Sequence, residues 1–401
     1  MRMYNTRLDG LTEYPFQRLA ALLAGVEPPR GQTPMIMSIG EPQHKAPDLL
    51  LSALGAAAGD WGKYPPNAGT ADYRTAVTGW CNARYGLPSG FLDSERHVLP
   101  VAGSREGLFM AAQLCVPPTK NGAAPTVLMP SPFYQVYFGA AVMNGATPVF
   151  VAATRETGFL PDYAAVARRH LANAAMAYLC TPANPQGTVA NLEQLKAAIT
   201  LARTHDFVLV SDECYSEIYD TVPPAGALQA CAALGDGLRN VLVFNSLSKR
   251  SSVPGLRAGF VAGDADLIAK FKILRAHGGA VQPMPVMSAA TALWRDETHV
   301  TANRALYRAK FDDAAQVFGN RFGFYRPAGG FFLWLDVGDG ERAAKILWRD
   351  AAIKVLPGAY LAVPDAAGRN PGAPYIRVAV VHEREVATSA LRRMKQVLET
   401  L

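Results

Sequence analysis

One short segment of this 401-residue chain carries most of the side chains that could do chemistry. A strand-like apolar run, residues 241–245, leads into Ser246, Ser248 and Lys249, and Arg257 follows eight residues after the lysine. A lysine where a buried strand ends can be desolvated, which lowers its pKa and frees the amine to attack a carbonyl group. The hydroxyl and guanidinium groups could bind a dianionic phosphate. Taken alone, the segment fits a solvated turn equally well.

Three other predicted strands also end in polar residues. These residues are Asp212 and Tyr215 after strand 207–211, Asn184 after strand 176–180, and Ser104 and Arg105 after strand 98–101. An acid that ends a hydrophobic strand is costly unless it meets a cation or hydrogen-bond donors. Free N–H groups at a helix start after residue 103 can hold a phosphate. Because open α/β sheets bind ligands outside the carboxyl ends of their strands, we expect these groups to meet at one site.

One cofactor needs this set of groups together. Pyridoxal 5'-phosphate offers an aldehyde to a lysine, a ring nitrogen to an acid, a phenolic oxygen to hydrogen-bond donors, and a phosphate. We therefore interpret the strand ends as a pyridoxal-phosphate site. An alternative of another class is a serine hydrolase, because Ser246 and Lys249 also match the S-x-x-K motif, although neither S-D-N nor K-T-G follows.

Strands and helices must alternate to position these groups. Helical patterns at 103–114, 192–204 and 264–276 separate short apolar runs, which predicts an α/β sheet with helices on both faces. The predicted strands are residues 98–101, 126–129, 148–152, 176–180, 207–211, 241–245 and 258–262.

The two ends of the chain have a different character. The first 45 residues are rich in Pro and Gly, whereas the part after residue 291 combines long helical patterns with a few strands. The helical patterns are 300–318, 341–352 and 383–398, and the strands are 331–337, 353–355 and 375–380. We predict a large domain with a mixed, mostly parallel sheet over residues 46–290. Residues 1–45 and 291–401 would form a smaller α+β domain.

The composition limits the kinds of ligand and the cellular compartment that we expect for this chain. Half of the residues are hydrophobic and 18% are charged, which is typical of a globular chain and not of a disordered one. The net charge of +6 comes from scattered basic residues, so we expect anionic small molecules and no nucleic acid. No apolar run reaches 18 residues, so we expect no membrane span. Five cysteines without a C-x-x-C pair indicate a reduced, cytoplasmic protein, and the seven histidines form no metal motif.

The motifs, in their order along the chain, resemble those of the class I and II aminotransferases, which are pyridoxal-phosphate enzymes of fold type I. Ser246-Leu247-Ser248-Lys249 followed by PGLRAG at 254–259 resembles the lysine signature of that family. NPQG at 184–187, DECY at 212–215 and YIR at 375–377 match its other landmarks in the same order. The resemblance extends from about Tyr14 to the C-terminus.

This resemblance implies how the cofactor would be bound. Lys249 would bond to the cofactor aldehyde and later carry the proton that moves during transamination. Asp212 would pair with the ring nitrogen, while Asn184 and Tyr215 would hydrogen-bond the ring oxygen. The phosphate would be bound by Ser104, Arg105, Ser246 and Arg257, the first two through their backbone N–H groups.

The resemblance also implies contacts to the cofactor ring, to the substrate and to a second subunit. Tyr134 would stack on the ring, although Phe133 competes with it by one position. Arg377 would bind the substrate α-carboxylate with its planar fork, beside Asn184 and the backbone of Gly40. Tyr64 would reach the phosphate of the neighbouring subunit, which implies a homodimer with shared sites. Arg105 replaces a threonine-like residue of the family, so its side chain either points away or contacts a second acidic group of the substrate.

Within the family, six stretches look like the N-succinyldiaminopimelate aminotransferase branch of lysine biosynthesis. They are residues 14–19, 38–47, 103–109, 132–141, 211–219 and 246–265. The implied reaction moves an amino group between glutamate and N-succinyl-2-amino-6-oxopimelate. An aspartate- or kynurenine-type aminotransferase is the alternative within the family, and a relative that binds the cofactor without turnover is a further one.

Overall fold

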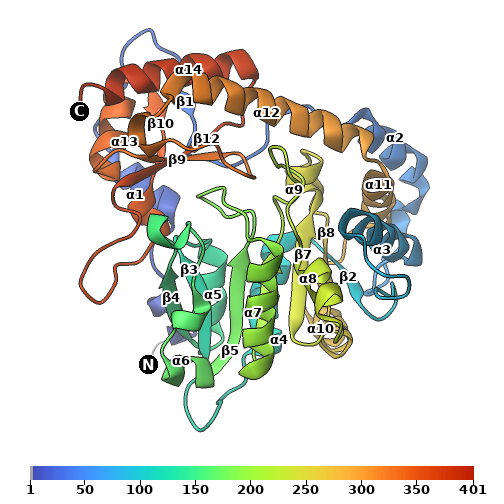
Figure 1. The fold of residues 1–401 in the computed structure, drawn as a ribbon. Coiled ribbons are helices and arrows are strands. Elements are labelled where there is room, and N and C mark those ends of the chain that lie inside the picture. Colours follow the sequence, from blue (N-terminus) through green and yellow to red (C-terminus); the bar gives the residue numbers. More distant parts are fainter. Residues whose placement is uncertain (1–2) are drawn as a thin grey trace.

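A seven-stranded sheet forms the centre of the computed structural model, which describes residues 3–401 (Figure 1). Its strands lie in the order β2-β8-β7-β6-β5-β3-β4, and only β8 is antiparallel to its neighbours. The bounds are β2 (Val98–Val101), β3 (Thr126–Ser131), β4 (Thr147–Ala152), β5 (Ala174–Cys180), β6 (Val208–Asp212), β7 (Val241–Ser246) and β8 (Gly259–Gly263). The predicted α/β class with a mixed, mostly parallel sheet is confirmed.

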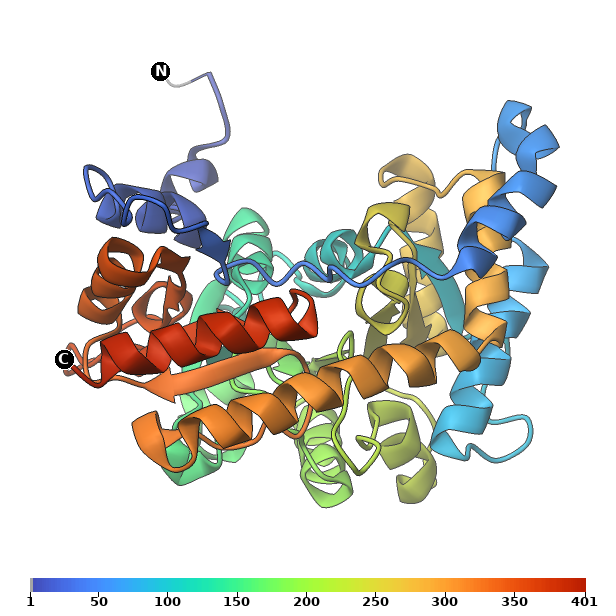
Figure 2. The same ribbon diagram turned by 90° about the horizontal axis from the view of Figure 1, so that it is seen from above.

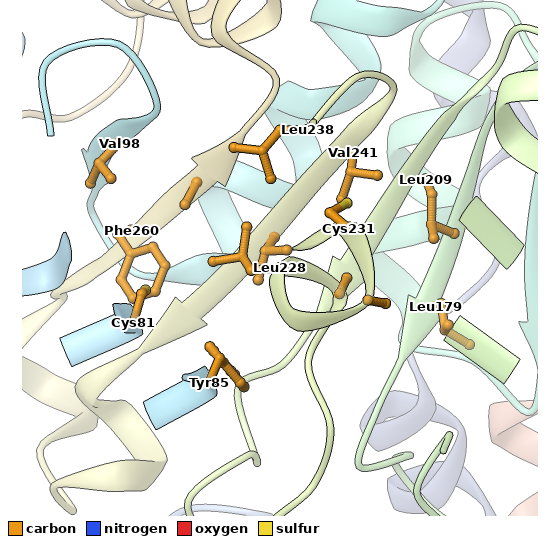
Figure 3. Close-up of a cluster of buried hydrophobic side chains, with 14 of the residues drawn as sticks. Cys81, Tyr85, Val98, Leu179, Leu209, Leu228, Cys231, Leu238, Val241 and Phe260 are labelled. Atoms are coloured by element: carbon orange, nitrogen blue, oxygen red, sulfur yellow. The ribbon is translucent and has the colours of Figure 1, made fainter. Parts of the chain in front are cut away.

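Helices cover both faces of this sheet, which explains why its inner strands are apolar on both sides. On one face, Phe260 and Val241 of the sheet lie in a cluster with Cys81 of α3 and Leu228 of α8 (Figure 3). The helices of this face are α3 (Ala71–Tyr85), α7 (Leu192–Thr204), α8 (Ala227–Leu234) and α11 (Met284–Arg295). Those of the other face are α4 (Ser104–Cys115), α5 (Gln135–Met143) and α10 (Ala265–His277).

Two smaller sheets lie beside the large one. Strand β12 pairs antiparallel with both β9 and β11, and β1 pairs parallel with β10. The strands are β1 (Met35–Ile36), β9 (Phe332–Asp336), β10 (Ile353–Lys354), β11 (Leu356–Pro357) and β12 (Tyr375–Ala379). A second hydrophobic cluster joins β9, β10 and β12 to α12 (Thr298–Phe318), α13 (Gly340–Ala351) and α14 (Arg384–Leu398).

The 21-residue helix α12 connects the two regions. Figures 1 and 2 show it running from the end near α11 to a position alongside α14. Its buried residues include Tyr307 and Phe311 of the second cluster, while Asn303 and Arg304 lie nearer to α9 and the strand ends. The remaining α-helices of the described residues are α1 (Pro15–Leu22), α2 (Asp48–Ala56), α6 (Arg168–Ala172) and α9 (Leu247–Arg250).

Candidate active site

The carboxyl ends of β5, β6 and β7 and the first turn of α4 surround one cavity. The parallel strands bring residues that are far apart in sequence to the same edge of the sheet. Most of the predicted site residues line this cavity: Gly40, Ser104, Arg105, Tyr134, Asn184, Asp212, Tyr215, Lys249 and Arg377.

Lys249 lies in α9, a short helix that begins directly after β7. Ser246 caps this helix, because its Oγ accepts a hydrogen bond from the N–H of Ser248 at 3.1 Å. The Lys249 Nζ donates to the carbonyl oxygen of Gly40 at 2.6 Å. Burial lowers the pKa of this amine to about 8. A sizeable fraction of Lys249 is therefore an uncharged nucleophile at mildly alkaline pH.

Asp212 is the last residue of β6, and it is buried. Its Oδ2 accepts a hydrogen bond from the hydroxyl of Tyr137 at 2.6 Å, and its Oδ1 accepts one from the N–H of Cys214 at 3.3 Å. Burial raises the pKa of this carboxyl group. Among residues 3–401, no Lys, Arg or His nitrogen lies within 4.0 Å of it. A ligand cation such as a protonated pyridine would supply the missing partner.

Arg377 presents a buried guanidinium group that has no carboxylate partner among residues 3–401. Its Nη1 donates to Asn184 Oδ1 at 3.1 Å and its Nη2 donates to the carbonyl oxygen of Ser38 at 2.7 Å. The buried Nε has no hydrogen-bond partner within the part of the chain that the structure describes. Burial lowers the pKa of Arg377 to about 10. The free N–H groups and the uncompensated charge fit a carboxylate that enters with a ligand.

Gly40 permits the backbone to approach the cavity. A Cβ at this position would lie 2.4 Å from Cζ of Phe332 and 3.2 Å from the Phe331 ring. Any larger residue would therefore displace either these rings or the carbonyl group that Lys249 contacts. This explains why a glycine stands here.

The first turn of α4 forms a cradle suited to an anion. Gly103 precedes the helix with a φ of +80°, and a Cβ there would lie 2.1 Å from Nη2 of Arg257. Arg257 donates to the carbonyl oxygens of Ala102 at 3.2 Å and Pro254 at 2.8 Å, so its charge lies beside the free N–H groups of the helix start. This combination fits the phosphate of pyridoxal phosphate.

Arg105 and Tyr134 lie together on the wall of the cavity. The Arg105 Nε donates to the Tyr134 hydroxyl at 2.8 Å, so the arginine side chain turns toward the cavity and not away from it. Phe133 packs against Phe138 and Phe150 in the core, with ring centres 6.2 and 5.1 Å away. Tyr134 is therefore the better candidate for stacking on a ring.

Tyr215 and Asn184 complete the same wall. The ring of Tyr215 packs edge-on against Phe331 and Phe332, at 5.3 and 6.0 Å between ring centres, and burial raises the pKa of its hydroxyl. Asn184 is held by Arg377 through its Oδ1. The Asn184 amide and the Tyr215 hydroxyl could thus donate to a ring oxygen, as the sequence predicts.

Three predicted residues do not line the cavity of this chain. Ser246 is buried and donates to the carbonyl oxygen of Ala258 at 3.0 Å. Arg257 is exposed, with its guanidinium against Gly103, and the Tyr64 side chain is fully exposed. The serine-hydrolase alternative is wrong, because the amine of Lys249 contacts Gly40 while the Ser246 hydroxyl is committed elsewhere.

Sequence reasoning missed Tyr137, which is the donor to Asp212. It lies three residues after Tyr134 at the start of α5, and this helical spacing places both rings on one side, 5.7 Å apart. The spacing was the available signal. In the range 3–401 there is no cluster of three His, Cys, Asp or Glu residues that could hold a metal ion. No helix of that range could span a bilayer.

Comparisons with known proteins agree with this geometry. Residues 33–394 match the family described as aminotransferase class I and II. The 4-dedimethylamino-4-oxo-anhydrotetracycline transaminase OxyQ of Streptomyces rimosus is 32% identical over 367 residues, which cover 89% of this chain and 92% of OxyQ. The LL-diaminopimelate aminotransferase of Moorella thermoacetica is 29% identical, over 98% of this chain and 97% of its own.

A solved structure supports the same assignment. The aminotransferase of Neisseria meningitidis Z2491 superposes with a TM-score of 0.94 at 38% identity, and the match covers 98% of this chain and 100% of that one. With the strand-end cavity, the half-buried lysine and the buried acid in place, the chain belongs to the class I and II aminotransferases, which are pyridoxal-phosphate-dependent transaminases of fold type I.

Proposed function

We propose that this aminotransferase moves an amino group between glutamate and N-succinyl-2-amino-6-oxopimelate. The observation that carries the proposal is the pair of arginines on the cavity wall, Arg377 and Arg105. Within residues 3–401, neither guanidinium has a carboxylate within 4.0 Å, so both are available to substrate. Glutamate and the pimelate derivative each carry an α-carboxylate and at least one more distant carboxylate. Arg377 would bind the first and Arg105 the second.

The catalytic roles follow from the contacts of each residue. When bound, pyridoxal phosphate supplies the aldehyde that accepts the amino group and a ring that stabilises negative charge on the neighbouring carbon. Lys249 holds the cofactor through its amine and then moves the substrate Cα proton at Nζ, for which a pKa of about 8 is well suited. Asp212 keeps the ring nitrogen protonated, and Tyr137 orients the carboxylate.

The remaining predicted residues orient the cofactor and the substrate. The N–H groups of Ser104 and Arg105, together with Ser246 and Arg257, bind the phosphate at the α4 cradle. Tyr134 stacks on the ring. The ring oxygen accepts hydrogen bonds from Asn184 and Tyr215, while Gly40 leaves room for the substrate beside Lys249.

We further propose that two copies of the chain share their sites. Tyr64 makes no contact with the cavity of its own chain. Trp61, three residues earlier, and Leu51 of the preceding helix α2 are 59% and 71% exposed. An exposed apolar segment of this kind suits a partner surface. If Tyr64 completes the partner's site, a mixture of Tyr64→Ala and Lys249→Ala proteins regains activity through hybrid dimers. Continued inactivity of a mixture that does form hybrids would contradict shared sites.

The two-domain division at residues 46–290, with 1–45 and 291–401 as the second domain, is also a proposal. The separate hydrophobic clusters support it, since two of them cover the large sheet and another joins the smaller sheets to α12, α13 and α14. The cytoplasmic location stays a prediction.

One other substrate has specific support. The relatives named LL-diaminopimelate aminotransferase favour the amine without the succinyl group. The test is a panel of amino donors with 2-oxoglutarate, comprising N-succinyl-LL-diaminopimelate, LL-diaminopimelate, aspartate and kynurenine. We expect the highest kcat/KM with the succinylated donor. A higher value for any other donor would replace the proposal with that substrate.

A further inference from the structure

A row of buried polar side chains lies behind the catalytic lysine, outside the cavity. Asn303 of α12 places its Nδ2 3.2 Å from the carbonyl oxygens of both Lys249 and Arg250. These carbonyls lie at the end of α9, where the four-residue helix offers them no partner of its own. Asn303 thus closes the end of the helix that carries Lys249.

The direction of each hydrogen bond in the row can be deduced. Backbone carbonyls only accept, so the Asn303 amide must face them with its NH₂ group and turn its Oδ1 to His44, 2.7 Å away. The Nδ1 of His44 must then carry a proton. Its Nε2 has a free lone pair, which accepts from the Lys310 Nζ at 2.6 Å. Each group in the row therefore donates to the next one: Lys310 to His44, His44 to Asn303, and Asn303 to the Lys249 carbonyl.

Lys310 is an unusual residue for this position. It is 2% exposed, and among residues 3–401 no carboxylate lies within 4.0 Å of its amine. Glu383, at the N-cap of α14, is the acidic group that acts on it, and Nζ lies 4.9 Å from the centre of the Tyr307 ring. A buried amine is costly to retain. Its contact is with His44. Burial disfavours protonation of this ring, and Lys310 opposes it further because two positive charges would then lie 2.6 Å apart.

His44 belongs to a segment that reaches the active site at two points. In this segment, Ser38 accepts from Arg377 and Gly40 accepts from the Lys249 amine. The carbonyl oxygen of His44 itself accepts from the Ser252 Oγ at 3.0 Å. The row thus joins this segment, α12 and α9 at the point where the lysine side chain starts.

From these contacts we propose that Asn303, oriented by His44 and Lys310, is a positioning residue for Lys249. Lys310 holds His44 in its neutral Nδ1–H form, His44 holds the Asn303 amide, and Asn303 holds the backbone from which the Lys249 amine projects. The proposal rests on the proposed role of Lys249 in catalysis. It adds residues that touch neither cofactor nor substrate.

The test compares Asn303→Leu and Lys310→Met with Gln316→Leu, a matched change on the exposed side of α12. Asn303→Leu keeps the size of the side chain but removes both donors. We expect it to lower kcat about 10- to 100-fold, as small displacements of a reacting group do, while KM for glutamate stays within about twofold because Arg377 is untouched. Lys310→Met should show the same pattern more weakly.

A second readout does not depend on turnover. In full-length protein freed of cofactor, mass spectrometry would follow amine labelling of Lys249 against pH. Asn303→Leu should shift the labelling midpoint, and Gln316→Leu should leave it in place. If the wild type showed no transaminase activity but the midpoint moved, the proposed function would fail while the positioning role stood. Unchanged kcat and unchanged labelling in Asn303→Leu would overturn the positioning role.

The tautomer of His44 is testable in the wild type, whatever the stability of the variants. In ¹⁵N-histidine NMR of the intact protein at pH 8, His44 should be neutral and protonated at Nδ1. A neutral Nε2–H form would turn the Asn303 amide around and refute the proposal, and a doubly protonated ring would refute the part in which Lys310 holds His44 neutral.

Discussion

Replacement of Arg377 by lysine would separate the charge of this residue from its shape. The guanidinium uses Nη1 for Asn184 and Nη2 for Ser38, which leaves Nε–H and one further N–H on each terminal nitrogen for a ligand. A lysine keeps the charge but loses the fork, so one charge-assisted hydrogen bond to the α-carboxylate is lost. Such a bond contributes about 1.5–3 kcal/mol, which corresponds to about a 10- to 150-fold weaker association.

The assay is steady-state kinetics of Arg377→Lys with glutamate and with the pimelate substrate. Both KM values should rise together, because both substrates present the same α-carboxylate. Arg105→Lys is the matched control, and it should change KM according to the distal group of each substrate. If Arg377→Lys raised only one KM, the residue would belong to the distal subsite, and a change below about twofold for both would refute the role altogether.

Other substitutions test single contacts. Tyr137→Phe removes a donor to Asp212, so cofactor affinity measured by fluorescence titration should fall about tenfold, and unchanged affinity would deny Tyr137 that role. Asp212→Asn removes the charge and should weaken cofactor binding by about 3–5 kcal/mol with a far slower turnover; unaltered kinetics would place the acid elsewhere. Gly40→Ala places a Cβ against Phe332 and should lower the free energy of unfolding, measured by chemical denaturation, by about 1–3 kcal/mol. An unchanged free energy of unfolding would show that the Phe332 ring moves aside without cost. In cofactor-free protein, the rate of amine labelling at Lys249 should rise with a midpoint near pH 8. The free energy of unfolding should also increase with pH above 8, because the unfolded chain keeps the Lys249 proton to a higher pH than the folded chain does. A labelling midpoint near the ordinary lysine value of about 10.4 would contradict burial of the amine.

The sheet was readable from the sequence because its strands are apolar on both faces. Strand β2 (Val98–Val101) and helix α7 (Leu192–Thr204) have the predicted bounds, and the other strands of the large sheet begin or end within two residues of the prediction. The Asn191 cap and its Gln194 partner mark the start of α7 clearly. Helix α1 (Pro15–Leu22) was not predicted, because the first 45 residues are rich in Pro and Gly. A proline can nevertheless be the first residue of a helix, as Pro15 is here.

The site was predictable in its residue types and less so in its contacts. Strand ends give the positions of Asp212, Asn184 and Lys249, because parallel strands deliver their carboxyl ends to one edge. The contact of Lys249 with Gly40, however, spans 209 residues, and that of His44 with Lys310 spans 266. Such pairs depend on how the smaller sheets and α12 pack, which no local pattern encodes.

The most direct test of the account is to find which lysine carries the cofactor. Within residues 3–401, burial lowers the pKa of two lysines, Lys249 and Lys310, to about 8, but only Lys249 lines the cavity. Borohydride reduction of the holoenzyme, followed by peptide mass spectrometry, would fix the cofactor to its lysine. The account predicts the label on Lys249 and its loss in Lys249→Ala, together with transaminase activity. A label on Lys310 or any other lysine, or normal turnover by Lys249→Ala, would contradict it.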